Sequence, residues 1–86
     1  MLPVESNPFD LVAAKDGSLW ITESGNDRIA KLSSSGLLLG EYGGLIAGSN
    51  PKGIVIDKLG NIWFAEYGTD HIGKMSPEGI LLAEYS

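Results

Sequence analysis

The acidic residues that could do chemistry recur along this chain at one fixed distance. Glu23 and Asp27 return 43 positions later as Glu66 and Asp70. A glutamate at the end of a strand can act as a base or hold a divalent cation, and an aspartate in a turn can accept hydrogen bonds from backbone amides. Because catalytic residues usually break the symmetry of a repeat, we expect these recurring carboxylates to support the fold rather than a reaction.

Two basic side chains occupy the next equivalent position in the two copies. We expect Arg28 to pair with a nearby acid. His71 is the one histidine of the chain, and its side chain titrates near neutral pH, so proton transfer or metal binding has to be considered. A metal site needs several such ligands, and oligomer symmetry is the one route that would gather copies of His71. We therefore predict no catalytic residue, no cofactor and no metal site within a single chain.

Four further candidates are not repeated and fall on the loops expected at one rim: Phe9, Asp10, Lys52 and Tyr67. Loops on a rigid scaffold carry function, but neutral drift also makes two copies differ, so both interpretations stay open. The full set of possible rim or channel binding residues is Phe9, Asp10, Glu23, Asp27, Arg28, Lys52, Glu66, Tyr67, Asp70 and His71.

The elements that must position these side chains belong to a unit that occurs twice. Residues 7–43 align with residues 50–86 without a gap, and 17 of the 37 aligned pairs are identical. A fixed period near ~40–50 residues is typical of propellers and solenoids, whose units bury their faces only against neighbours. We therefore divide the chain into an incoming connector (1–6), a first blade (7–43), a connector between blades (44–49) and a second blade (50–86).

Each unit is predicted to form four short strands separated by tight turns. The expected strands are 11–14, 19–23, 28–32 and 37–42 in the first unit, and 54–57, 62–66, 71–75 and 80–85 in the second. Apolar runs such as Leu37–Leu39 do not alternate with polar residues, so both faces of each sheet should be covered, as in blades sandwiched between other blades. Trp20 and Trp63 should be buried between blades. The predicted fold class is all-β, with two four-stranded antiparallel propeller blades per chain.

The repeated motifs resemble the blades of a known family. The unit Asn-Pro, apolar strand, Gly-x-Leu/Ile-Trp-Ile/Phe-x-Glu, Gly-x-Asp-x-Ile-x-Lys, Gly, x-Glu-Tyr resembles the blade of the streptogramin lyases (virginiamycin B lyases). It is also similar to the related NHL repeat, in which the sequence Gly-Asn-Asp-Arg-Ile of residues 25–29 is typical. The resemblance covers essentially the whole chain.

That resemblance implies a closed propeller of six or seven blades. For the lyases it also implies a divalent-metal-assisted elimination that opens a cyclic peptide antibiotic, with histidine and glutamate ligands from several blades. Family blades often carry Pro-His-Gly at the start of the inner strand. This chain has Pro-Phe-Asp at residues 8–10 and Pro-Lys-Gly at residues 51–53. No residue here matches a catalytic histidine of the family.

The composition and charge of the chain disfavour some classes of partner. The apolar fraction of 43% and the charged fraction of 20% are globular. A net charge of −5 disfavours nucleic acid and anionic membranes as partners. No apolar run approaches the ~18 residues of a membrane span, and no signal peptide is visible because Pro3 and Glu5 interrupt the start of the chain. The compartment is left unassigned.

Two blades alone would leave two apolar faces in contact with water. The contact between blades is head to tail, so identical chains would continue it until a ring closes. Three chains give six blades and four give eight, and we favour the trimer because the resembling families have six or seven blades.

The expected function is therefore a self-assembling propeller module without chemistry of its own, a fragment or engineered piece of a longer propeller. Two alternatives stay open. One is a lyase-like site in the axial channel that uses magnesium. The other is an NHL-like rim that binds a protein or a small ligand.

Overall fold

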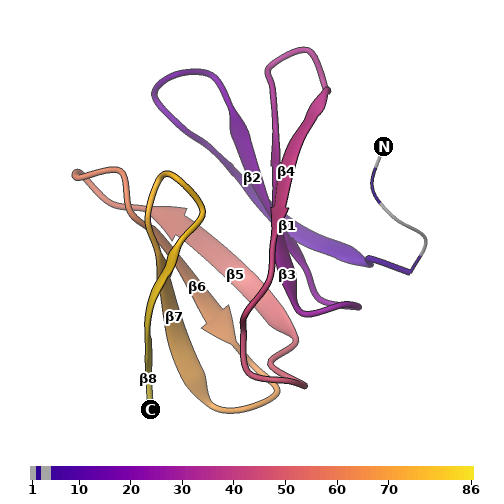
Figure 1. Cartoon of the computed structure of the whole chain (residues 1–86), viewed down its shortest axis with the longest axis vertical. Coiled ribbons are helices and arrows are strands. Elements are labelled where there is room, and N and C mark those ends of the chain that lie inside the picture. The colour runs from indigo at the N-terminus through magenta and orange to yellow at the C-terminus, as the bar shows by residue number, and fades with distance from the viewer. Residues whose placement is uncertain (1, 3–4) are drawn as a thin grey trace.

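The computed structural model describes residue 2 and residues 5–86, so the predicted incoming connector lies partly outside the described residues. The described chain forms eight strands: β1 (Pro8–Ala13), β2 (Leu19–Glu23), β3 (Arg28–Leu32), β4 (Leu38–Tyr42), β5 (Pro51–Ile56), β6 (Ile62–Glu66), β7 (His71–Met75) and β8 (Leu81–Tyr85). They make two antiparallel sheets, β1-β2-β3-β4 and β5-β6-β7-β8, each a simple meander (Figure 1). The predicted all-β class with two four-stranded antiparallel sheets is confirmed. In this part of the chain, no helix has the length and hydropathy needed to cross a membrane.

The strand bounds agree with the prediction in the middle of each sheet and differ at its edges. β2, β3, β6 and β7 have the predicted limits. The first strand of each sheet begins three residues earlier than predicted, at Pro8 and Pro51. In both, the pairing register shifts between the proline and the apolar run, so a bulge carries two further residues, one of them Asp10 or Lys52, within the strand. The fourth strands begin one residue later than predicted, next to a second register shift.

The tight turns follow from glycine. Gly17 and Gly60 close the first hairpin of each sheet with φ of +90° and +87°. Side chains on L-residues disfavour this left-handed region, so glycine at this place in both copies fixes where each first strand ends.

One face of the first sheet packs against one face of the second. Strand pairing puts Trp20 opposite Lys31 in the first sheet and Trp63 opposite Lys74 in the second. We call the face that carries the tryptophan the forward face of each sheet, and the opposite face the rear face. The hydrophobic core lies between the forward face of the first sheet and the rear face of the second, and it consists of Trp20, Ile29, Leu45, Ile54, Ile62, Phe64 and Met75.

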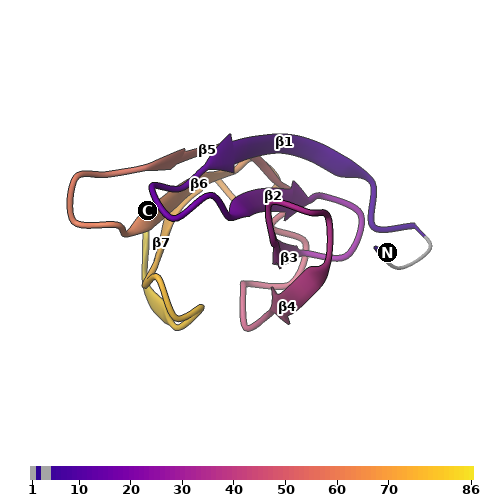
Figure 2. The same ribbon diagram turned by 90° about the horizontal axis from the view of Figure 1, so that it is seen from above.

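The two sheets meet along their first strands. β5 packs against β1 and β2, and Figure 2 shows β1 and β5 side by side at one edge, with β4 at the opposite edge. The buried hydroxyl of Thr22 joins the sheets, because it accepts a hydrogen bond from the Asp10 N–H (3.1 Å) and donates one to the Lys52 carbonyl (2.7 Å). We call the whole contact between the forward face of the first sheet and the rear face of the second, with this bridge, the joint.

The two tryptophans have different surroundings. Trp20 is 2% exposed and packs between the sheets, as predicted. Trp63 is half-buried on the forward face of the second sheet, which no other blade of this chain covers. Each indole stacks on a tyrosine of the outer strand, Trp20 on Tyr42 with ring centroids 5.6 Å apart and Trp63 on Tyr85 at 5.9 Å.

Candidate functional site

The predicted site residues lie at the ends of the sheets where the second strand turns into the third. Glu23 pairs in register with Arg28, and Glu66 pairs with His71 on one side and with Pro51 on the other. Strand pairing therefore brings the recurring glutamates next to the two basic positions in both blades.

A cavity of about 320 Å³ opens at this end of the second blade. It gathers half of the predicted set, and its lining consists of Lys52, Ala65, Glu66, Tyr67, Asp70, His71, Ile72, Tyr85 and Ser86. The first-blade candidates Glu23, Asp27 and Arg28 do not line this cavity. One blade thus presents five of the ten predicted residues around a single hollow.

Three of the four unrepeated residues meet at the rim. The Lys52 ammonium lies 4.3 Å from the centre of the Tyr67 ring and 5.2 Å from that of the Phe9 ring. Both rings are exposed, so each cation–π contact contributes about 0.5–1 kcal/mol. The carboxylate of Asp10 is used locally, where it accepts the Leu11 N–H at 2.8 Å.

His71 is held by its own turn. Its Nδ1 lies 2.6 Å from the Thr69 carbonyl oxygen. Because a carbonyl oxygen can only accept, Nδ1 is the donor in this contact. In residue 2 and residues 5–86, no three His, Asp or Glu side chains gather in a way that could hold a metal ion.

Each blade contains a pair of neighbouring glutamates, of which one is buried and the other half-buried. Glu23 and Glu66 are 0% and 1% exposed, and none of their carboxylate oxygens has a hydrogen-bond partner among the described residues. Burial, followed by the neighbouring Glu41, raises the pKa of Glu23 to about 7. Burial, followed by the neighbouring Glu84, raises the pKa of Glu66 to about 8. Glu23 and Glu66 therefore bind a proton more tightly than exposed glutamates do.

The pKa of Glu66 is raised more than that of Glu23, and local sequence differences explain this. The Asn26 amide and the Arg28 guanidinium favour the charged form of Glu23 and so hold its pKa down. The second blade has Thr69 and His71 at these positions. The charge of Asp27 from the first blade adds to the repulsion that raises the pKa of Glu66.

Sequence reasoning did not identify the partners in these pairs. Glu41 and Glu84 follow the same pattern as the candidates, since each stands in a recurring Glu-Tyr dipeptide. That recurrence was the available signal. Only the folded sheet reveals that two glutamates 18 positions apart in the chain come together.

Asp27 and Asp70 behave differently although they are equivalent. Asp27 accepts two hydrogen bonds from the connector between the blades, from the Gly48 N–H at 2.9 Å and from the Asn50 N–H at 2.8 Å. The predicted binding of backbone amides is correct for Asp27, but the amides belong to the end of the connector and the first residue of the second blade rather than to its own turn. Asp70 is exposed.

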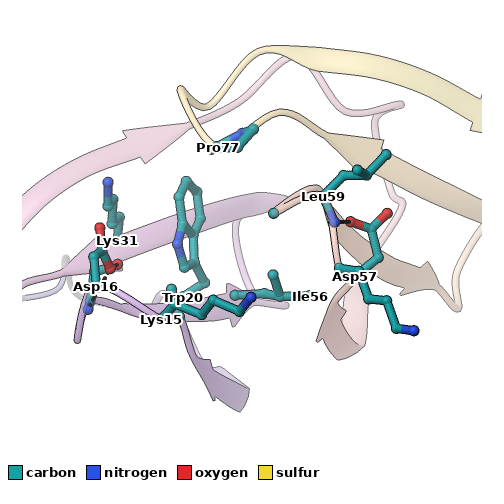
Figure 3. A pocket seen from close by; sticks show the side chains of 12 residues that line it. Lys15, Asp16, Trp20, Lys31, Ile56, Asp57, Leu59 and Pro77 are labelled. Carbon is teal, nitrogen blue, oxygen red and sulfur yellow. Dashed lines mark hydrogen bonds between the residues drawn. The ribbon is translucent and has the colours of Figure 1, made fainter.

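A second cavity, of about 290 Å³, lies between the blades at the opposite end, where sequence reasoning placed no candidate. In Figure 3 the Trp20 indole stands in its wall, with Lys31 on one side and Asp57 and Leu59 on the other. Its acidic groups are engaged locally. Hydrogen bonds from Ser18 lower the pKa of Asp16, and the bond from the Trp63 indole N–H (2.8 Å) lowers that of Asp57. This hollow is a groove between blades rather than a reactive centre.

The strand order and the packing of sheet on sheet define two consecutive blades of a β-propeller. The chain is similar to streptogramin B lyase, with 29% identity and a TM-score of 0.89 over 99% of this chain. It is also similar to virginiamycin B lyase from Staphylococcus aureus, with 28% identity and a TM-score of 0.89. The same similarity holds for a catalytically inactive variant of that lyase, with a histidine replaced by alanine, in complex with quinupristin.

This chain spans only 28–29% of the length of those proteins. The sequence matches no protein-family profile, and a search of curated proteins finds no match. The likeness therefore establishes the lyase-like propeller blades and leaves the activity to be argued from the site.

Proposed function

We propose that this chain is a self-assembling propeller module that forms a closed ring of six blades from three copies and has no chemistry of its own. The observation that carries the proposal is the unequal covering of equivalent residues. Ile29 is fully buried in the joint, whereas its counterpart Ile72 is 45% exposed. On the rear faces, Ile54 is 6% exposed and its counterpart Leu11 is 58% exposed. The chain thus contains one complete joint. It also exposes the two faces that could form another, the forward face of the second blade and the rear face of the first.

The amount of exposed surface does not by itself argue for association. The accessible area is 4880 Å², which is close to the ~4900 Å² expected for a folded chain of this mass. The identity of the exposed side chains is what favours association. The forward face of the second blade exposes Val55, Ile72 and Tyr85 together, and fully burying an aliphatic side chain of this size contributes about 1.5–3 kcal/mol. Association costs about 4–15 kcal/mol, so assembly should depend on protein concentration.

The ring size follows from the head-to-tail joint. A contact between unlike faces adds copies until the ring closes, and each copy contributes two blades. Six blades from three copies and eight from four both lie within the range of about 4–8 blades seen in propellers. We favour three copies because the resembling families have six or seven blades, and copies of two blades cannot make seven.

The mass in solution tests this proposal. Light scattering on a sizing column should give about three times the chain mass of 9.1 kDa, and the thermal midpoint should rise with protein concentration because folding and association are linked. A mass of four chains would replace the six-bladed ring by an eight-bladed one. A chain that stays monomeric at every concentration and unfolds cooperatively would overturn self-assembly.

The alternative function is a lyase-like enzyme. The cavity beside Glu66 favours it, since a carboxyl with a pKa of about 8 can act as a base near neutral pH. An elimination also needs a group or metal that stabilises the developing negative charge. The positions of the family's Pro-His-Gly motif hold Phe9 and Lys52 here, so we expect no turnover of a type B streptogramin with magnesium. Turnover that Glu66→Gln abolishes would make the rim cavity an active site.

A further inference from the structure

At the joint inside the chain, one aspartate binds the segment that leads into the second blade. Asp27, in the turn between β2 and β3, uses its Oδ2 to accept the Gly48 N–H and its Oδ1 to accept the Asn50 N–H. Hydrogen bonds to a charged group are about twice as strong as neutral ones. Because each oxygen holds one amide, a single side chain fixes where the connector enters the second blade.

The start of the chain already has the backbone of that connector. Gly48 and Asn50 have φ of +81° and +50°, and their counterparts Glu5 and Asn7 have +67° and +47°. Ser6 is held as Ser49 is, by a bond from a glycine N–H to its carbonyl: Gly25 to Ser6 and Gly68 to Ser49, each at 2.9 Å. A glutamate in the left-handed region is strained. The amides of Glu5 and Asn7 are thus arranged like those that Asp27 binds.

The other end of the chain carries the matching acceptor. Asp70 has a φ of +58°, close to the +55° of Asp27. The turn before it is closed by the same bond, Thr69 N–H to the Glu66 carbonyl at 3.3 Å, as Asn26 N–H to the Glu23 carbonyl at 3.3 Å. Asp70 is exposed, and within residues 5–86 its carboxylate has no counterpart of the two bonds that Asp27 accepts.

We propose that Asp70 of one copy binds the Glu5 and Asn7 amides of the next copy, and that this aspartate clasp closes the joint between chains. The inference rests on the proposed ring and adds the contacts that close it. The partner is a second copy of this chain because its Glu5–Asn7 segment already has the backbone conformation of the segment that Asp27 holds. The acceptor and the donors of the clasp lie on the two faces that have no partner blade within the chain.

An aromatic contact supports the same docking. In the joint inside the chain, the Tyr42 ring packs directly on Gly79, so a Cβ at that glycine would collide with the ring. The counterpart Gly36 has no atom within 4 Å of such a Cβ, and the counterpart Tyr85 is exposed. Docking the next copy as the second blade docks on the first would place Tyr85 on Gly36.

The test compares Asp70→Asn with a matched loss of charge, Glu78→Gln, at an exposed residue in the β7–β8 turn. Light scattering over a dilution series gives the dissociation constant of the assembly. Asp70→Asn should weaken assembly at least tenfold, while Glu78→Gln should leave it within about twofold of the parent chain. Hydrogen exchange by NMR should show the Glu5 and Asn7 amides protected in the assembled parent chain and exchanging in the Asp70→Asn variant.

The outcomes separate the two proposals. A parent chain that stays monomeric overturns the ring and, with it, a second copy as the occupant of this face. A parent chain that assembles, with an Asp70→Asn variant of unchanged affinity and unprotected Glu5 and Asn7 amides, overturns the clasp alone. Unfolding of Asp70→Asn as a monomer would also contradict the clasp, because it would mean that Asp70 acts within its own chain.

Discussion

The first blade buries its forward face against the second, and the second blade leaves its own forward face in water, although both present tryptophan, isoleucine and tyrosine at equivalent positions. Trp20 and Ile29 lie in the core, whereas Trp63 is half-buried and Ile72 is exposed. The difference does not come from the residues on these faces. It comes from the neighbour, which shows that a blade's core is completed by whatever packs on it.

On the rear faces, the buried and exposed blades are exchanged. The second blade buries Pro51 and Ile54 against the first, while Pro8 and Leu11 of the first blade are exposed. Each blade is therefore half finished, on opposite faces. Substitutions at equivalent positions should separate what stabilises one chain from what joins chains.

The largest expected difference is between the two tryptophans. Trp20→Ala should reduce the free energy of unfolding by about 3–5 kcal/mol at any protein concentration, because it empties the core between the blades. Trp63→Ala should cost much less in dilute protein and should mainly weaken assembly. Urea unfolding at low and high concentration measures both effects. Equal losses in dilute, monomeric protein would show that Trp63 is also part of the core of the single chain.

The two aspartates should differ in the same way. Asp27→Asn removes a charged acceptor from two amides within the chain, so it should destabilise the monomer by about 1–3 kcal/mol. Asp70→Asn should leave the unfolding of the dilute chain unchanged. Thermal melts of both variants in dilute protein test this contrast. If the Asp27→Asn variant were as stable as the parent chain, other contacts would hold the connector.

The two buried glutamates, Glu23 and Glu66, predict an unusual dependence of stability on pH. Both Glu23 and Glu66 bind a proton more tightly in the folded chain, where their pKa values are about 7 and about 8, than in the unfolded chain, where the value is 4.5. Their contribution to stability is therefore complete below pH 4.5 and is lost as the pH rises to about 7 for Glu23 and about 8 for Glu66.

Urea unfolding between pH 4.5 and 8.5 measures this loss. Asp16 and Asp57, whose pKa values are lowered from 3.8, act only below this window. Both glutamates contribute to the slope above pH 4.5, so Glu23→Gln should reduce it up to about pH 7, and Glu66→Gln should reduce it up to about pH 8. Stability that rises with pH across the window would show that the pairs are ionised and stabilised in another way.

The smallest expected effect comes from one hydroxyl. Thr22 bridges the blades within the chain, and its counterpart Ala65 on the open face cannot. Ala65→Thr should strengthen assembly by about 1 kcal/mol, roughly fivefold, by offering the same bond to the next copy. Ala65→Val adds similar bulk without the hydroxyl and serves as the control. An equal gain in both variants would assign the effect to packing.

Much of the fold could be predicted because the sequence contains it twice. The central strands follow from short apolar segments between glycine turns, and Gly17 and Gly60 mark their starts. The bulges after Pro8 and Pro51 were not predicted because a bulge places a charged residue, Asp10 or Lys52, inside a strand, where the pattern indicates a loop.

The candidate site was predicted less completely, for a physical reason. Glu41 and Glu84 meet their partners only across a folded sheet. Asp27 binds amides 21 and 23 positions away, at the junction of the connector with the second blade. A pattern within one unit contains no information about such a contact. The buried environments that raise the pKa values of Glu23 and Glu66 are also created by neighbouring segments.

The hydroxyl of Thr22 has one more consequence for a ring built from these chains. Joints with the hydroxyl bridge would alternate with joints that lack it. The ring would therefore dissociate at the joints between chains, and the two blades of each chain would stay packed together. Subunits would then exchange as intact pairs of blades. Mixing two isotopically labelled preparations should yield hybrid rings with whole-chain steps in mass, at a rate that Ala65→Thr slows.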